Sequence, residues 1–422
     1  MTQPQRDCVI AGGGPAGMML GYLLARAGLA VTVVEKHADF FRDFRGDTVH
    51  PSTITLLAEL GLREKFLALP VTQLCTLDAV VEGERMTLVD FGVLRAPDNF
   101  LVLAPQWDFL DFLAQEARTL PGFDLQMDTE AIGLLRAPLD QDAGREDAQG
   151  TDSAGDVLGL RVRSAGGDQQ IHARLTVAAD GRTSALREAA GLRAVESGVP
   201  IDVLWFSLPK PSEPPPATLA YVSSAGMVLT IDRGDTYQSG LIIKKGAFPA
   251  MQQTGITEFR TRLVAAAPVL AGVADTLTEW EQIKLLTVQI NRLLRWHRPG
   301  FIAIGDAAHA MSPMFGVGVN YAIQDAVALA NAITPQLRQG VVPERTLAGV
   351  QARRERPVKV MQAIQGRGHR VIARATVGQR VLSLGAVRLL RLGSPVLRRI
   401  LARVVGVGLL PEHVRTPPGG SR

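Results

Sequence analysis

A glycine-rich turn near the start of the chain constrains its fold more than any other feature. Cys8 to Ala11 is a short apolar run that ends at Gly12-Gly13-Gly14-Pro15-Ala16-Gly17, and Pro15 to Ala27 has helical periodicity. A β-branched run, Val31 to Val34, follows and ends at Glu35. Strand, turn, helix and strand therefore fit within about 30 residues, the length of a βαβ unit.

The spacing of the glycines indicates what this turn binds. Gly12, Gly14 and Gly17 match G-x-G-x-x-G, in which the first glycine permits the tight turn, the second admits a pyrophosphate and the third lets helix and strand pack closely. The positive end of the helix then faces the phosphates. Glu35 ends the second strand, where a carboxylate accepts hydrogen bonds from ribose hydroxyls. The sequence predicts a dinucleotide site but does not, from this motif, separate FAD from NAD.

Two further stretches place polar residues at the ends of buried strands. Phe301 to Ile304 is an apolar strand followed by Gly305-Asp306, then Pro313 and the run Gly316-Val317-Gly318-Val319-Asn320 before a long helix. An aspartate there can accept hydrogen bonds from a polyol, and glycines before a helix present N–H groups to an electron-rich acceptor. The other stretch, Val177 to Ser184, runs from a strand through the turn Asp180-Gly181 into a helix.

Together the three stretches resemble the fingerprints of class A FAD-dependent monooxygenases of the para-hydroxybenzoate hydroxylase family. The resemblance covers about Asp7 to Arg370. In that family the position of Asp306 binds the ribityl chain, Pro313 and the glycine loop lie against the isoalloxazine ring, and Asp180-Gly181 lies between FAD and the nicotinamide cofactor. The resemblance implies these FAD-binding residues: Gly12, Gly14, Pro15, Ala16, Gly17, Glu35, Lys36, Arg45, Gln106, Asp180, Gly181, Gly305, Asp306, Pro313, Gly316, Gly318, Val319 and Asn320.

The expected fold class is α/β. The resemblance implies a GR2-type Rossmann-like FAD-binding domain with an inserted β-sheet substrate domain and a helical C-terminal tail. The expected FAD-binding domain is discontinuous and comprises 1–73, 104–200 and 286–370, the substrate domain comprises 74–103 and 201–285, and the basic amphipathic helical tail comprises 371–422. Trp205, Tyr221, Tyr237, Met314 and Phe315 are candidates for lining the substrate pocket, although each also fits a plain core position.

The activity that the resemblance implies is monooxygenation. NAD(P)H, bound transiently, reduces FAD; O2 forms a flavin C4a-hydroperoxide; and one oxygen is inserted into an aromatic or a polyketide- or isoprenoid-like small molecule. Hydroxylation, epoxidation and Baeyer–Villiger insertion all stay open, as does a reductase or dehydrogenase acting on a lipophilic substrate. A non-catalytic binding protein on this fold is disfavoured because the FAD fingerprints are intact. The sequence identifies no catalytic side chain, and His309 is expected to be structural rather than an acid–base group.

Charge is distributed unevenly along the chain. From Arg338 to Arg422 there are 17 Lys and Arg against 3 Asp and Glu, so the preceding part carries a balance of −10 within a net +4. The basic tail is interpreted either as a peripheral contact with anionic lipid or as a cover over the FAD-binding domain or a homodimer contact. Two cysteines, a polar start and the lack of a long uncharged apolar stretch favour a cytoplasmic protein, with no metal and no nucleic-acid partner expected.

Overall fold

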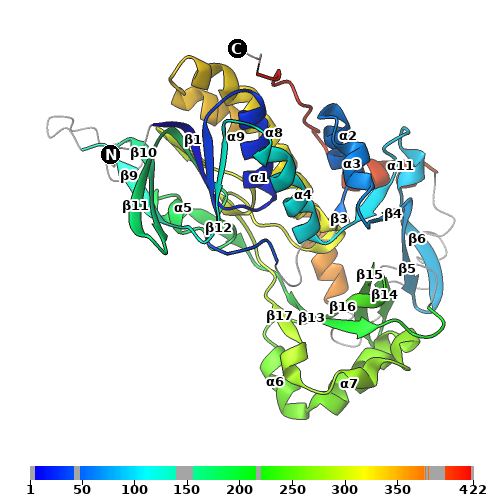
Figure 1. Cartoon of the computed structure of the whole chain (residues 1–422). Helices are drawn as coiled ribbons and strands as arrows, with labels where there is room; N and C mark the ends of the chain where they lie inside the picture. The colour runs from blue at the N-terminus through cyan, green and yellow to red at the C-terminus, as the bar shows by residue number, and fades with distance from the viewer. Residues whose placement is uncertain are drawn as a thin grey trace.

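The computed structural model describes residues 5–41, 48–138, 155–214, 220–374, 376, 379 and 395–419. Arg45 and the greater part of the polar segment around 141–156 lie outside these residues. Figure 1 shows a helix-covered sheet in one half of the molecule and a second sheet, flanked by a separate pair of helices, in the other. Each sheet organises one half of the molecule.

The first sheet is built on the predicted βαβ unit. Its apolar strand residues are buried, and α1 (Pro15–Arg26) and α8 (Gly318–Arg338) cover one side of the sheet. Strand β1 pairs in parallel with β2 and with β11, which places the end of β11 beside the glycine turn. The strand order is β19 (His297–Arg298), β20 (Phe301–Ala303), β11 (Gly167–Ala178), β1 (Arg6–Ala11), β2 (Val31–Val34) and β8 (Phe123–Gln126), with β10 (Val157–Ser164) and β9 (Glu130–Arg136) continuing from β11.

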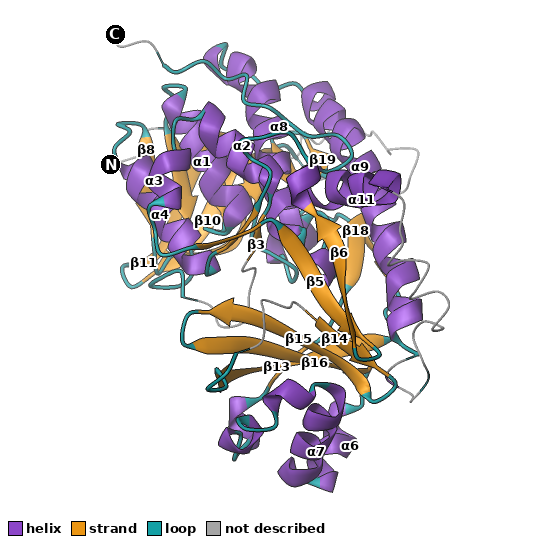
Figure 2. Ribbon diagram, turned by 90° about the vertical axis from the view of Figure 1, so that its right-hand side faces the viewer, coloured by secondary structure: helices purple, strands orange, loops and turns teal. Residues whose placement is uncertain are grey.

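The second sheet has one helix-covered face and one face turned toward the first half of the molecule (Figure 2). Side chains alternate between the two, so that Leu204 and Phe206 pack on α6 (Phe248–Thr254) and α7 (Ile256–Ala266), whereas Val203 and Trp205 belong to a different core cluster. The strand order is β17 (Lys284–Leu286), β13 (Ile201–Pro209), β16 (Thr236–Lys244), β15 (Gly226–Arg233), β14 (Ala220–Ser223), β5 (Thr76–Val81) and β6 (Glu84–Asp90).

Short elements join the two sheets. A small sheet runs in the order β3 (Thr48–Val49), β7 (Leu101–Leu103) and β4 (Thr72–Leu74), and β12 (Ala194–Ser197) pairs with β18 (Ile290–Leu293). The remaining helices are α2 (Pro51–Glu59), α3 (Arg63–Leu67), α4 (Gln106–Arg118), α5 (Ala185–Ala189) and α9 (Glu344–Ile372). Helix α9 packs on α8 and reaches the second sheet, where Ile372 contacts the cluster that contains Trp205.

The C-terminal region is helical only in part, which corrects the expectation for 371–422. Helix α9 continues to Ile372, α11 spans Pro395–Ala402 and a π-helical turn spans Arg403–Val407, but 408–419 is irregular. Residues 403–419, called here the C-terminal segment, cross α2, α8 and α1. Hydrogen bonds that would prolong a helix are replaced by tertiary ones, such as Asn331 Nδ2 to His413 O at 2.8 Å and Gly419 N to Arg26 O at 2.7 Å. Among the described helices, none is both long and apolar enough to cross a bilayer.

A buried histidine anchors the C-terminal segment and should make stability depend on pH. His50 is fully buried and its Nδ1 lies 2.8 Å from Val405 O, and burial lowers its pKa to about 4. The unfolded chain therefore binds a proton more readily, so stability is complete above the unfolded pKa of about 6.5 and falls as the pH drops toward 4. The full effect is roughly 3 kcal/mol at 1.36 kcal/mol per pKa unit.

We expect His50→Asn, which can still donate to Val405 O but does not titrate, to flatten this pH dependence. The measurement is the free energy of unfolding by denaturant between pH 7 and pH 4. His172→Asn, at an exposed histidine, is the matched control and should leave the profile unchanged. A His50→Asn profile as steep as that of the unmodified protein would contradict the assignment.

Candidate functional site

The glycine turn has the close approaches that its sequence requires. A Cβ on Gly12, whose φ is 106°, would lie 2.3 Å from Ala179 O, and one on Gly17 would lie 2.0 Å from Gly12 O. These two glycines therefore let β1, β11 and α1 pack against each other. A Cβ on Gly14 would meet nothing within 4 Å, and Gly14 has an ordinary φ of −73°. Only this middle glycine faces open space, which is where a pyrophosphate would approach the backbone.

Glu35 braces the glycine turn from the end of β2. Its Oε2 accepts a hydrogen bond of 2.8 Å from Gly13 N, and its Oε1 accepts one of 3.2 Å from His37 N. The carboxylate is thus held at the edge of the turn, in the position expected for a ribose partner. Lys36, next in the chain, is exposed, and Pro15 and Ala16 form the first turn of α1.

The two aspartate motifs meet in space although they are far apart in sequence. Arg182, just after Asp180-Gly181, donates from Nε to Asp306 Oδ2 over 2.9 Å. Asp180 accepts from Leu186 N over 3.3 Å, while its Oδ1 is buried without a hydrogen-bond partner in the described residues. Burial raises the pKa of Asp180, against the opposing effect of its hydrogen bonds. The pairing of β11 with β20 brings these motifs together, because the two parallel strands end at the same edge of the sheet.

A third group of residues surrounds the start of α8. Thr48 Oγ1 donates to Gly316 O over 3.0 Å, and Thr48 pairs with Leu103, three residues before Gln106. Gln106 itself is the first residue of α4. Phe315 has a φ of 66°, a strained value for a bulky residue that often marks a functional turn. Like Gly14, Gly318 would carry a Cβ into open space.

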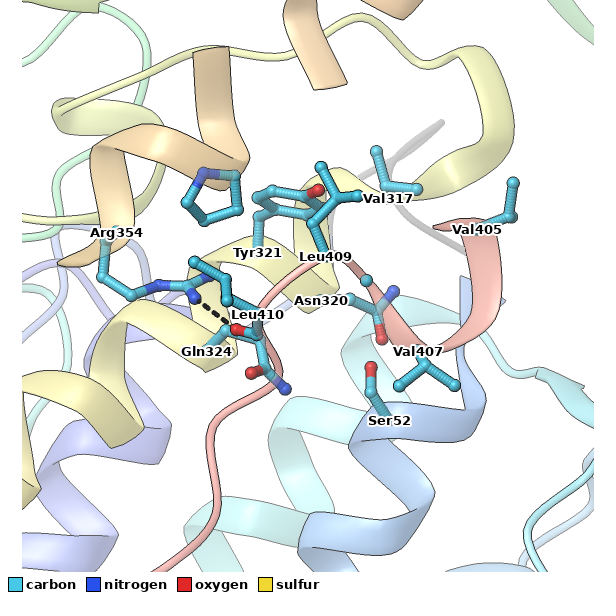
Figure 3. A pocket seen from close by; sticks show the side chains of 12 residues that line it. Ser52, Val317, Asn320, Tyr321, Gln324, Arg354, Val405, Val407, Leu409 and Leu410 are labelled. Carbon is cyan, nitrogen blue, oxygen red and sulfur yellow. Dashed lines mark hydrogen bonds between the residues drawn. The ribbon is translucent and has the colours of Figure 1, made fainter. Parts of the chain in front are cut away.

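The side chain of Asn320 connects two helices, a contact that the sequence did not predict. Its Oδ1 accepts hydrogen bonds from His50 N at 3.0 Å and from Thr53 Oγ1 at 2.6 Å, so the side chain ties α8 to the start of α2. The Oδ1 atom of this predicted cofactor ligand is therefore engaged with the start of α2 (Figure 3), whereas its Nδ2 has no hydrogen-bond partner among the described residues. The backbone N–H groups of Val319 and Asn320 belong to the first turn of α8.

These observations fit an extended dinucleotide with a ring system at one end. Gly14, Gly181 and Gly318 would all carry a Cβ into open space, and neither α1 nor α8 has a side-chain cap at its N-terminus. Uncapped N-termini present unsatisfied N–H groups and a partial positive charge, which suit phosphates and an electron-rich ring edge. Asp180 Oδ1 adds a buried acceptor that lacks a donor among the described residues. The residues present could hold FAD in the orientation that the resemblance implies.

His309 is structural, in agreement with the expectation. It is 2% exposed, and its Nε2 lies 2.5 Å from Asp325 Oδ2. Asp325 also accepts from Gly305 N at 3.1 Å and pairs with the buried Arg354 at 3.0 Å. Burial alone would raise the pKa of Asp325, but His309 and Arg354 outweigh it and hold that pKa below its usual range. The charged carboxylate of Asp325, on α8, thereby fixes the Gly305–His309 turn.

Side chains of α9 hold the backbone that precedes and includes the Pro313 turn. Gln365 donates from Nε2 to Ser312 O at 3.1 Å and to Met314 O at 3.0 Å, and accepts from Ser312 N at 3.2 Å. Gln362 donates to Ala310 O at 3.1 Å, and His369 Nε2 lies 2.7 Å from Ser312 Oγ. Burial lowers the pKa of His369 to about 4, so its ring is neutral. Sequence reasoning missed this group because glutamines in a helix carry no motif.

The second sheet turns an apolar face toward the first half of the molecule. Met227, Leu229 and Ile231 alternate along β15 as half-buried residues, and Ile231 shares a cluster with Phe315 beside the Pro313 turn. Trp205 lies on the same face, with its ring over Gly240. Tyr221 and Tyr237 pack in the core beneath α7 on the other face, which corrects their proposed place in the pocket.

The sequence of this chain is similar to those of known FAD-binding proteins. A sequence model described as FAD binding domain matches residues 5–364. The 6-methylpretetramide 4-monooxygenase of Streptomyces rimosus is 30% identical over 406 residues, which cover 94% of this chain and 91% of that protein.

Solved structures share the fold. P. aeruginosa PqsL in complex with 2-aminobenzoylacetate superposes with a TM-score of 0.72 at 22% identity, covering 91% of this chain and all of that one (100%). The OxyS anhydrotetracycline hydroxylase of Streptomyces rimosus also gives a TM-score of 0.72 at 22% identity, covering 95% of this chain and 76% of the other.

The open side of Gly14 allows a substitution that should block the cofactor without disturbing the fold. In Gly14→Val the new side chain enters the space expected for the pyrophosphate, where it displaces charge-assisted hydrogen bonds worth about 1.5–3 kcal/mol. We expect FAD affinity, measured by fluorescence titration of the apoprotein, to fall about 10- to 100-fold. Stability of the apoprotein should change by less than about 0.5 kcal/mol. Gly272→Val, at another glycine with open space around its Cβ, is the control. Unchanged FAD affinity in Gly14→Val would exclude this binding mode.

Gln365→Leu tests whether α9 sets the position of the Pro313 turn. The variant leaves backbone groups of Ser312 and Met314 without their side-chain partner, so the turn should lose its fixed position. We expect the fraction of NAD(P)H consumption that yields product to fall several-fold, a readout that a loss of general stability does not move. Gln253→Leu, at an exposed glutamine of α6, should leave the coupling unchanged. Full coupling in Gln365→Leu would show that the hydrogen bonds of Gln365 have no role in the reaction.

Proposed function

We propose, because this chain belongs to the FAD binding domain family and is an FAD-dependent monooxygenase, that it inserts one oxygen atom into a fused-ring aromatic compound of the polyketide type. The support is the relative that acts on 6-methylpretetramide and aligns with nearly the whole of this chain. FAD, when bound, supplies the redox and oxygen-activating chemistry, with NAD(P)H as transient reductant and O2 as co-substrate.

The protein itself would bind FAD, orient it and exclude water from the reacting centre. We assign the pyrophosphate to the backbone around Gly14 and the N-terminus of α1, a ribose to Glu35, and the ribityl chain to Asp306. The uncapped N-terminus of α8 at Gly318 would stabilise negative charge on reduced FAD through its partial positive charge. Arg182, which pairs with Asp306, lies where it can exchange that partner for the cofactor.

A second support for the substrate class is the half-buried apolar face of β15 beside the Pro313 turn. Met227, Leu229 and Ile231 are half-buried apolar residues on one face of β15, on which planar rings could pack, and Ile231 shares a cluster with Phe315. We place the substrate between this face and the isoalloxazine ring, in a substrate-binding part made of 74–103 and 201–285. Apolar side chains on this side would also keep water from the reacting centre.

The direct test is substrate-stimulated O2 uptake by the FAD-loaded protein with NADH or NADPH. The panel contains fused-ring phenols, single-ring phenols and polyenes. Stimulation by the fused-ring phenols above the others supports the substrate class. Stimulation by polyenes alone would overturn it, and NAD(P)H oxidation without O2 uptake would instead favour a reductase.

Trp205 offers a test of the substrate site itself. Its side chain is 6% exposed, and the indole Nε1 has no hydrogen-bond partner among the described residues. Trp205→Phe keeps the aromatic surface but removes this donor, so KM for the fused-ring substrate should rise about tenfold, corresponding to one hydrogen bond of about 1–1.5 kcal/mol. Trp280→Phe, at the tryptophan that packs on Phe248 and Phe259 under the other face of the sheet, should leave KM unchanged. Equal KM values in both variants would remove Trp205 from the site.

We further propose a cytoplasmic location, because NAD(P)H is supplied there. Contact of the basic C-terminal region with anionic lipid and a homodimer contact stay predictions. Liposome co-sedimentation of the full chain and of a chain that ends at Gly368 tests the first, since equal binding would exclude the tail as the lipid contact.

A further inference from the structure

Gly240 lies on the face of the second sheet that is turned toward the first half of the molecule. On β16 it is directly opposite Trp205 of β13 on one side and Leu229 of β15 on the other. Side chains of residues that are paired across neighbouring strands point to the same face of a sheet. Trp205, Gly240 and Leu229 therefore form one row across the sheet, and the middle position of this row has no side chain.

The indole ring of Trp205 fills the space that Gly240 leaves. A Cβ on Gly240 would lie 2.9 Å from Trp205 Cζ3, 3.0 Å from Trp205 Cε3 and 3.1 Å from Val203 Cγ1. Carbon atoms in contact normally lie about 3.5–4.0 Å apart, so even a methyl group would displace this rigid ring. Gly240 does not have a positive φ, so space rather than backbone conformation requires glycine here.

A displaced ring would move away from the sheet. The methyl group of an alanine at position 240 would project from this face, so it would push the ring toward the first half of the molecule. Trp205 is buried in a cluster with Ile242 and Ile290, whereas Leu229, at the other end of the row, is half-buried. The row thus runs from the core to the face on which we place the substrate.

Helix α9 connects this row to the part of the first half that is assigned to FAD. Ile372, at the end of α9, packs against the cluster that contains Trp205. Gln365, about two turns earlier in the same helix, donates hydrogen bonds to Ser312 O and Met314 O in and before the Pro313 turn. The position of the Trp205 ring therefore bears on the width of the space between the second sheet and this turn.

We propose that Gly240 makes the site selective for flat, fused-ring substrates by letting the Trp205 ring lie against the sheet. This inference rests on the function proposed above, which places the substrate between this face and the isoalloxazine ring. With the indole flat, the row that ends at Leu229 leaves room for a wide planar ring system. With the indole raised, a single ring would still fit and a wider one would collide. Gly240 is a positioning residue, because it acts through Trp205.

The experiment measures ligand binding and turnover separately on the FAD-loaded full chain. A hydroxyanthracene and phenol itself are titrated without NAD(P)H, and the change in flavin fluorescence gives their dissociation constants. Substrate-stimulated O2 uptake then gives kcat/KM for both compounds. In Gly240→Ala we expect the preference for the hydroxyanthracene to fall about tenfold in both measurements. Gly133→Ala is the control, at a glycine of β9 whose Cβ would meet the end of the flexible Arg161 side chain.

Two further variants separate a change in selectivity from a general loss of stability. Trp205→Leu has no indole ring to displace, so adding Gly240→Ala to it should change the preference by less than about twofold. Leu229→Phe fills the row from its half-buried end and should lower the preference for the hydroxyanthracene while Gly240 stays intact. This second variant tests the row even where Gly240→Ala does not fold.

Three results would overturn the role of Gly240. They are an unchanged preference in a folded Gly240→Ala protein, an unchanged preference in Leu229→Phe, and an equally large effect of Gly240→Ala in the Trp205→Leu background. Failure of the proposed function gives a different result. The shift in dissociation constants would then occur without stimulated O2 uptake, which supports the role of Gly240 in binding and contradicts the proposed substrate class.

Discussion

The buried carboxylate of Asp325 is the interaction on which the arrangement of the site depends. It accepts a hydrogen bond from Gly305 N, lies 2.5 Å from His309 Nε2 and pairs with Arg354, and all three partners are themselves buried. A charge in this position is tolerated only because it is fully paired, and removal of one partner would leave it uncompensated at a cost of about 3–5 kcal/mol. The turn that carries Asp306 is fixed as a consequence.

The same charge network connects the cofactor region to the end of the chain. Arg354 binds Asp325 with one part of its guanidinium and Leu410 O with another, and Glu412 lies 3.6 Å away. The C-terminal segment is therefore part of the support behind the Gly305–His309 turn. Helix α9 contributes twice, through Arg354 to this network and through Gln365 to the Pro313 turn.

Local motifs could be predicted from the sequence because each depends on residues close together in the chain. The glycine turn, the acid that ends β2 and the strand before Asp306 occur as expected, since apolar periodicity and glycine spacing encode them directly. The contact of Arg182 with Asp306 and the hydrogen bonds of Gln365 to Ser312 depend on the packing of distant elements and have no local signal. Asn320 stays a predicted cofactor-binding residue, and the structure adds that its Oδ1 bonds to His50 and Thr53, a contact without a local signal.

The tail shows why periodicity alone misleads at the chain end. Leu, Val and Ile with interleaved Arg predict a helical region within 371–422, yet 408–419 follows an irregular course, because its backbone finds partners in Glu59, Asn331 and Arg26. The tyrosines of the second sheet show the same limit. The sequence gives their alternation, but which face meets the first half of the molecule is set by α6 and α7.

Isotopically labelled dioxygen tests the central claim most directly. The FAD-loaded protein is supplied with NAD(P)H, labelled O2 and a fused-ring phenol, and the product is examined by mass spectrometry. Monooxygenation predicts one labelled oxygen atom in the product, with the other released as water. A product that contains only unlabelled oxygen, formed while NAD(P)H is consumed, would contradict it.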